Sequence, residues 1–78
     1  MSVKVLFFGA TADIVGCRQL MLEREASTAS RLVEDLVSDH PALASHKLLI
    51  SINQQYATGN QTVRDGDVVA IFTAVSGG

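Results

Sequence analysis

The chain has 78 residues, which is enough for one small domain with a modest hydrophobic core. Apolar residues make up 47% of the sequence, a share typical of a folded domain and too high for a disordered tail. The formal net charge is -2 and the six Lys and Arg residues are scattered, so the sequence lacks the basic patch that nucleic-acid binding usually needs.

Signals for targeting, disulfides and metal binding are missing from the sequence. No signal-peptide pattern occurs, and no apolar run approaches the roughly 20 residues that cross a bilayer. We therefore expect a cytoplasmic protein that does not act at a membrane. The single cysteine, Cys17, rules out an internal disulfide. With His40 and His46 as the two histidines, strong ligands are too few for a structural zinc site, and we expect no bound metal.

Two strands are predicted in the first third of the chain. Residues 3–8 are mostly β-branched, apolar or aromatic and end at Gly9, as is typical of a β-strand. Residues 9–16 contain Thr, Asp and two glycines, which predicts a loop or wide turn. Residues 18–23 are apolar enough for a second strand, which we expect to pair with the first in antiparallel fashion.

The clearest periodic signal predicts a helix that begins at residue 29. Apolar residues recur there at helical spacing on one face: Ala29, Leu32, Val33, Leu36 and Val37. Thr28 is the predicted N-cap, because its hydroxyl can accept a hydrogen bond from a free N–H of the first turn. Pro41 ends the helix, since proline biases the preceding residue away from helical dihedral angles.

Two more strands are predicted in the second half of the chain. Residues 48–52 form an apolar strand, and residues 54–64 are polar and irregular. Residues 65–67, with the sequence Asp-Gly-Asp, predict a tight turn, because glycine adopts positive φ at no steric cost. That turn leads into residues 68–75, the most hydrophobic strand.

The order of these elements is strand, strand, helix, strand, short elements and strand. A single amphipathic helix covers one face of the sheet, which predicts a two-layer α+β domain. The order is that of a β-grasp fold with a mixed sheet, in which the first and last strands lie at the centre. We expect the domain to span residues 1–75 and residues 76–78 to form a flexible tail.

Side-chain alternation predicts an uncovered apolar face on this sheet. Lys4 does not fit a small core, so its neighbours Val3 and Val5, together with Phe7, should face the helix. Leu6 and Phe8 should then point to the opposite face. No second long helix is predicted to cover that face, and an exposed apolar sheet face indicates a docking surface. For the last strand the alternation is ambiguous.

The C-terminus is the remaining candidate for chemistry, because no side chains form a nucleophile–base pair or a phosphate-binding loop. The chain ends in Gly77-Gly78, directly after the last predicted strand. Since glycine has no side chain, such a tail can enter a narrow tunnel in another protein. An ATP-dependent enzyme can convert its carboxylate to an acyl adenylate, which sulfur, an amine or a thiol can attack. The alternative is an ordinary frayed end. We expect Cys17 to be an unreactive thiol and not a persulfide carrier.

Several segments match a known protein family. They are residues 4–10, Val15-Gly16, Leu48-Leu49 with Asn53-Gln54, residues 65–72 and the closing residues 75–78. On these segments nearly the whole chain resembles the small, sulfur-carrier subunits of molybdopterin synthase, which are ubiquitin-like β-grasp proteins. The Asp-Gly-Asp turn and the terminal Gly-Gly are shared with other sulfur carriers. The chain departs from many members at Thr73-Ala74, where they have Pro-Pro, and at Asp13, where they have Glu.

The resemblance implies a mechanism and a set of partners. A ubiquitin-activating-like adenylyltransferase would use ATP to adenylate the Gly78 carboxylate, and a sulfur donor enzyme would convert it to a thiocarboxylate. The tail, with Ser76 and Gly77, would enter the large catalytic subunit, and sulfur would pass to cyclic pyranopterin monophosphate. The chain would bind no permanent cofactor and would be the sulfur-donating small subunit of a two-subunit sulfurtransferase. The resemblance also implies a partner-binding surface formed by Phe8, Tyr56, Phe72 and Val75.

Two alternatives remain open. The chain could carry sulfur for another product, such as thiamine thiazole or thiolated tRNA. It could instead be a β-grasp interaction module whose terminal glycines carry no chemistry, and such a module would tolerate loss of the tail.

Overall fold

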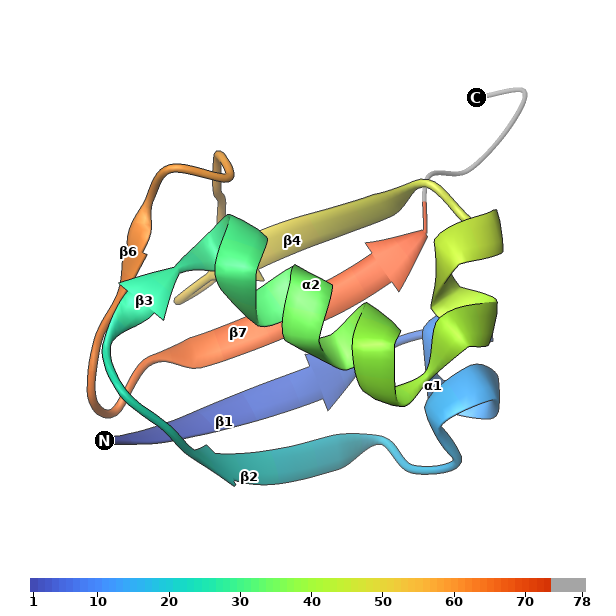
Figure 1. Cartoon of the computed structure of the whole chain (residues 1–78), viewed down its shortest axis with the longest axis horizontal. Helices are drawn as coiled ribbons and strands as arrows, with labels where there is room; N and C mark the ends of the chain where they lie inside the picture. Colours follow the sequence, from blue (N-terminus) through green and yellow to red (C-terminus); the bar gives the residue numbers. More distant parts are fainter. Residues whose placement is uncertain (74–78) are drawn as a thin grey trace.

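A five-stranded mixed sheet and one main helix form the two layers of the fold in the computed structural model, which describes residues 1–73. The elements in chain order are β1 (Ser2–Phe7), α1 (Ala10–Val15), β2 (Gln19–Glu23), β3 (Ser27–Thr28), α2 (Ala29–Asp39), the 3-10 helix η1 (Pro41–Ser45), β4 (Leu48–Ile52), β5 (Gln55–Tyr56), β6 (Thr62–Val63) and β7 (Val68–Thr73). The sheet has the order β2-β1-β7-β4-β5, and β3 pairs separately with β6. Figure 1 shows α2 lying across one face of the sheet.

The predicted strand order and the position of the first and last strands are confirmed. β1 and β7 are neighbours and run parallel, with Leu6 opposite Ala70 and Phe7 opposite Ile71. β2 pairs with β1, and β4 pairs with β7, both in antiparallel fashion. This is the two-layer ubiquitin-like β-grasp arrangement.

Helix α2 begins and ends where the sequence predicts. The Thr28 hydroxyl accepts a hydrogen bond from the backbone N–H of Arg31 at 3.3 Å, which satisfies one free donor of the first turn. The helix ends at Asp39, and Pro41 opens the 3-10 helix that follows. Within residues 1–73, no helix combines the length and the apolar character that a membrane span requires.

The core lies between α2 and the sheet. β1 alternates as predicted: Val3, Val5 and Phe7 are at most 2% exposed and face the helix layer. Leu32 and Leu36 of α2 pack against them as part of the same buried cluster. The cluster has eleven buried apolar side chains among residues 1–73, and in a domain of this size their burial is a main source of stability.

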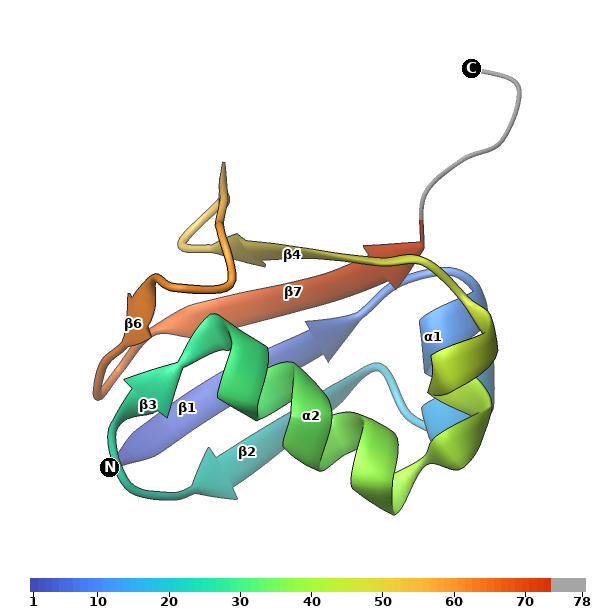
Figure 2. The same cartoon turned by 45° about the horizontal axis from the view of Figure 1, so that its top comes forward.

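The prediction that residues 9–16 form a loop is wrong, because α1 occupies Ala10–Val15. Gly16 ends this short helix in the left-handed conformation, with φ of 89°, and its N–H donates to the Ala12 carbonyl. Ile14 and Val15 pack against the core, so tertiary contacts stabilise a helix too short to form alone. Figures 1 and 2 show α1 beside the 3-10 helix, at the end of the sheet where β1 finishes.

The Asp-Gly-Asp turn at residues 65–67 forms as predicted, with Gly66 at φ of 82°. The Asp65 carboxylate accepts from the Ser2 N–H at 2.7 Å, and the Gly66 N–H donates to the Ser2 carbonyl at 2.8 Å. The Asp67 carboxylate accepts from the Arg64 N–H at 2.8 Å. The two bonds to Ser2 tie the start of β1 to the turn that precedes β7 and help to hold the parallel register of the two central strands, whereas the Arg64–Asp67 bond closes the turn itself.

Candidate functional site

The helix-free face of the sheet contains a hollow of about 830 Å³. We call it the aromatic hollow, and it is lined by Leu6, Phe8, Gly9, Ser51, Asn53, Gln54, Val68, Ala70, Phe72 and Thr73. Most of these side chains are apolar, and the apolar ones come from β1, from Phe8 directly after it, and from β7. A partner can therefore bury apolar surface here without disturbing the core on the other face.

Strand register assembles the hollow from distant parts of the sequence. Leu6 of β1 lies opposite Ala70 of β7, and Ala70 lies opposite Ser51 of β4. Residues that lie opposite each other in a sheet point to the same face, so these three form one row across it. Val69 and Ile71 are fully buried on the helix side, which leaves Val68, Ala70 and Phe72 for the helix-free face.

Phe8 points away from the core, as the position of Lys4 predicted. It is 53% exposed, whereas its neighbour Phe7 is 2% exposed. The Phe8 N–H donates to the Ile71 carbonyl at 3.1 Å, which fixes the end of β1 against β7 beside Phe72.

Thr11 fixes the backbone at the same place. It is fully buried, and its hydroxyl lies 2.7 Å from the Phe8 carbonyl oxygen and 3.0 Å from that of Ile71. The hydroxyl oxygen also accepts from the Phe8 N–H at 3.1 Å. Thr11 thus joins α1 to both strands that carry the hollow's aromatic residues, and it positions Phe8 without touching the exposed surface.

Tyr56 stands at the edge of this face. It lies opposite Ser51 across β4 and β5, and it is 78% exposed. Its ring centroid is 5.8 Å from that of Phe72, at an interplanar angle of 57°. Tilted aromatic pairs at this separation are attractive, so Tyr56 extends the aromatic surface outward from Phe72.

The hairpin between β4 and β5 closes one end of the hollow. Both of its loop residues, Asn53 and Gln54, have positive φ, at 51° and 70°. Asparagine tolerates this conformation better than glutamine does, and strained residues of this kind collect at functional surfaces. The Asn53 side chain accepts from the Val68 N–H and donates to the Asp67 carboxylate, each at 3.0 Å, which holds the hairpin against β7.

The structure therefore brings Phe8 and Phe72 to one hollow and places Tyr56 beside Phe72. Val75, Ser76, Gly77 and Gly78 lie outside the described residues, as does the expected domain boundary after residue 75. Within residues 1–73, no three His, Cys, Asp or Glu side chains form a cluster that could hold a metal ion.

Other residues of the hollow were not placed by sequence analysis. The alternation of the last strand is ambiguous because Val68, Val69, Ala70 and Ile71 are all apolar. Its pairing with β1, which would resolve it, cannot be read from one sequence. In the sequence, Asn53 and Gln54 mark the end of a strand and belong to a segment that resembles the family, but nothing places them beside Phe8. Thr11 falls in a predicted loop.

Comparison with known proteins identifies the family. The model of the ThiS family matches residues 5–78. The molybdopterin synthase sulfur carrier subunit of Haemophilus influenzae is 35% identical, with 97% of this chain and 99% of that protein aligned.

Two solved structures share the fold. A putative molybdopterin converting factor subunit 1 from Pyrococcus furiosus aligns with a TM-score of 0.87 at 23% identity, over 96% of this chain and 99% of the other. The complex of subunits 1 and 2 of the Helicobacter pylori molybdopterin-converting factor contains a chain that aligns with a TM-score of 0.67 at 21% identity, over the full length of both chains. The chain belongs to the ThiS family and is a member of the molybdopterin synthase sulfur carrier subunits.

Proposed function

We propose that this chain carries sulfur for molybdenum cofactor biosynthesis, as a thiocarboxylate at Gly78. The observation that carries the proposal is the position of the aromatic hollow in a member of this family. Phe72 and Thr73, the last residues of β7, line the hollow, and residues 74–78 follow directly in the sequence. Five extended residues reach at most about 17 Å. One partner can therefore hold the helix-free face and reach the terminal glycine at the same time.

The proposed chemistry begins at the Gly78 carboxylate. One of its oxygens attacks the α-phosphorus of ATP on an activating enzyme of the ubiquitin-activating type, which releases pyrophosphate and leaves an acyl adenylate. Hydrosulfide supplied by a donor enzyme then attacks the glycyl carbonyl carbon. A C–S bond forms, the C–O bond to AMP breaks, and the Gly78 thiocarboxylate and free AMP are the products. ATP is thus a substrate of the activating enzyme, and this chain holds no cofactor of its own.

The large subunit of molybdopterin synthase is the proposed partner for sulfur transfer. It would dock on the aromatic hollow and Tyr56, take the tail into its active site and pass sulfur to cyclic pyranopterin monophosphate. Two transfers would supply the two sulfur atoms of the dithiolene. The Helicobacter pylori complex, in which subunit 1 is bound to subunit 2, supports this pairing. All of these steps would take place in the cytoplasm.

The role of this chain is to present an unhindered acyl group from a rigid body. Gly77 and Gly78 add no side chain to the tail, so the tail can pass through a narrow channel. The catalytic side chains belong to the large subunit in this proposal, and the carrier supplies the sulfur and the docking surface.

Intact mass spectrometry tests the proposal. After incubation with ATP, the activating enzyme and a sulfur source, the chain should exchange one oxygen for one sulfur. The Cys17→Ser variant should load equally well, whereas Gly77→Val should load or transfer poorly while its thermal unfolding stays unchanged. A folded Cys17→Ser protein that no longer takes up sulfur would contradict the proposal.

The acceptor to which the sulfur-loaded protein transfers its sulfur distinguishes the alternative functions. Transfer of its sulfur to cyclic pyranopterin monophosphate by the large subunit supports the proposal. Transfer to a thiazole precursor or to tRNA would instead identify a different pathway. An interaction module would show no sulfur uptake and would keep its partner after deletion of residues 76–78.

A further inference from the structure

A second surface lies at the opposite edge of the sheet from β5. β2 is an edge strand, and within residues 1–73 its only pairing is with β1. Edge strands are usually protected by proline, a bulge or inward-pointing charges, because their free N–H and C=O groups can pair with another strand. Residues 19–23 contain no proline, and their pairing with β1 runs without a bulge.

The hydrogen bonds between β1 and β2 show which backbone groups of β2 point outward. Arg24 exchanges hydrogen bonds with Met1, at 2.8 and 2.9 Å, and the Phe7 N–H donates to the Arg18 carbonyl at 2.8 Å. Since hydrogen-bonded and non-hydrogen-bonded pairs alternate in an antiparallel ladder, the even-numbered residues of β2 face β1. The N–H and C=O groups of Gln19, Met21 and Glu23 therefore point outward.

A groove of about 560 Å³ runs beside this free edge, between β2 and α2. Leu20 and Leu22 of β2 and Leu36 of α2 form its apolar part. Three carboxylates and two guanidinium groups line it as well. The carboxylates belong to Glu25, Asp35 and Asp39, and the guanidinium groups to Arg24 and Arg31. The Glu23 side chain points to the helix-free face, where its carboxylate accepts a hydrogen bond from the Ser2 hydroxyl.

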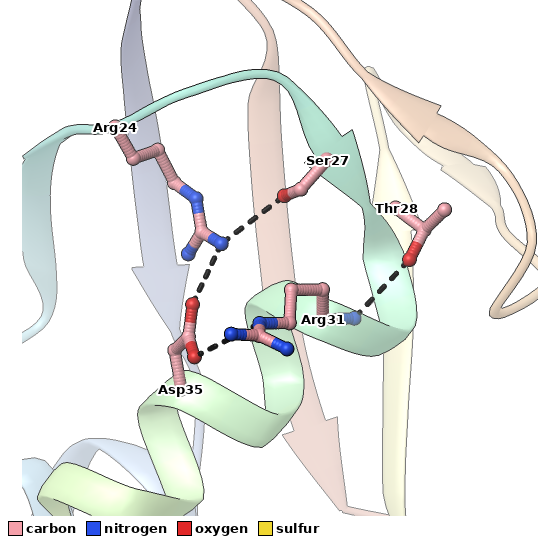
Figure 3. A network of polar contacts seen from close by, with 5 residues as sticks. All are labelled: Arg24, Ser27, Thr28, Arg31 and Asp35. Atoms are coloured by element: carbon pink, nitrogen blue, oxygen red, sulfur yellow. Dashed lines mark hydrogen bonds and ion pairs between the residues drawn. The ribbon is translucent and has the colours of Figure 1, made fainter.

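Both guanidinium groups are already engaged by Asp35. Arg24 Nη2 lies 2.7 Å from one Asp35 oxygen, and Arg31 Nε lies 3.5 Å from the other (Figure 3). Arg24 Nη2 also donates to the Ser27 hydroxyl at 3.1 Å. Among residues 1–73, no ion pair involves the other two carboxylates of the groove, those of Glu25 and Asp39. Their negative charge is available to a partner.

We propose that β2 binds an extended peptide segment of a partner protein by strand addition, and that this segment alternates apolar residues with Lys or Arg. The main chain of the segment would pair with Gln19, Met21 and Glu23. Its Lys or Arg side chains would lie over Leu20 and Leu22, with their methylene groups on the leucines and their charges at the carboxylates. Its apolar residues would lie beside Met21, which is 59% exposed on the helix-free face.

A second copy of this chain fits the edge less well. In the symmetric antiparallel pairing that places Met21 against Met21, Arg18 lies opposite Arg24. Like charges directly opposite each other destabilise a strand pair. Self-pairing would also place leucines in the groove and leave its carboxylates without a cation.

Binding can be measured by NMR titration of the ¹⁵N-labelled full chain with a capped peptide of alternating lysine and valine. The backbone amides of Gln19, Met21 and Glu23 should shift, and their hydrogen exchange should slow at saturation. A peptide of alternating glutamate and valine should bind at least about tenfold more weakly, because its carboxylates would face the carboxylates of the groove. The lysine–valine peptide with N-methyl groups on alternate residues, which cannot complete the ladder, should also bind at least tenfold more weakly.

Variants of the chain complete the test. Met21→Pro removes an outward N–H and should abolish binding, and Met21→Thr, which keeps that N–H, should retain it. The double variant Glu25→Lys, Asp39→Lys should bind the lysine–valine peptide more weakly and the glutamate–valine peptide more tightly than the unchanged chain does. Three results would overturn the proposal: equal binding of the acidic and basic peptides, shifts confined to the aromatic hollow, or protection of the β2 amides that rises with protein concentration in the absence of peptide.

Discussion

The two faces of the central sheet are formed by the same strands but differ in how deeply their side chains are buried. On the helix side, Val5 and Ile71 are fully buried beneath α2 and Phe7 is 2% exposed. On the other side, Phe8 is 53% exposed, and Ala70 and Phe72 are only partly buried. Neighbouring residues of one strand therefore differ in burial because a strand directs them to opposite faces. The covered face stabilises the fold, and the uncovered face is free to bind a partner.

The largest expected effect is on the covered face. Phe7→Ala should lower the free energy of unfolding by about 3–5 kcal/mol, because it leaves a cavity in a small core. Denaturant unfolding measures this directly. The matched control is Phe8→Ala, one residue away, which should change stability by less than about 1 kcal/mol. The reverse result would mean that the strand register is shifted by one residue.

The next effect is on the uncovered face and concerns binding. Phe8→Ala should weaken binding to the large synthase subunit by about 2 kcal/mol, or roughly 30-fold, because aromatic anchors carry much of the energy of an interface. Calorimetric titration of the folded variant with the large subunit measures this loss of affinity. Unchanged affinity for both Phe8→Ala and Phe72→Ala would remove the aromatic hollow from the interface.

Thr11 is buried and bonded to the backbone at Phe8 and Ile71, and its substitution should have a smaller effect than the two changes above. Thr11→Val keeps the shape of the side chain but leaves the Phe8 carbonyl without its 2.7 Å hydroxyl partner, at a cost of about 1–2 kcal/mol of stability. Thr11→Ser keeps the hydroxyl and should retain most of the hydrogen-bonding contribution. If valine and serine behave alike in thermal unfolding, the hydrogen bonds of the Thr11 hydroxyl do not contribute to stability.

The smallest effect should be on the outer surface of α2. Arg31 is 66% exposed in its side chain, and its contact with Asp35 is 3.5 Å long. Arg31→Ala should change stability by no more than about 0.5 kcal/mol, since exposed ion pairs contribute little. It should leave affinity for the large subunit unchanged. A strong loss of affinity would place the partner on the helix and not on the aromatic hollow.

Sequence patterns were sufficient for the elements with strong periodicity or clear ends. Lys4 determined the alternation of β1, Thr28 and Pro41 marked the ends of α2, and Gly66 marked the turn before β7. Each of these residues has a local physical requirement that does not depend on distant contacts.

The features that were missed depend on contacts between distant residues. α1 is held by packing against the core, and Thr11 reaches Ile71, which is sixty positions away in sequence. The aromatic hollow requires the pairing of β7 with both β1 and β4, and no local pattern encodes that register. The alternation set by Lys4 and the family resemblance point to Phe8, and the resemblance points to Phe72. Only the structure brings Asn53, Gln54 and Ala70 to the same hollow.

The most direct test of the central claim is methyl NMR of the labelled chain bound to the unlabelled large subunit. The helix-free face is predicted to be the docking surface, so the methyl groups of Leu6, Val68 and Ala70 should show the largest shifts. The methyl groups of Val33 and Val37 on α2 should remain at their free positions. The largest shifts on α2, with Leu6 and Ala70 unchanged, would contradict the assignment of the two faces.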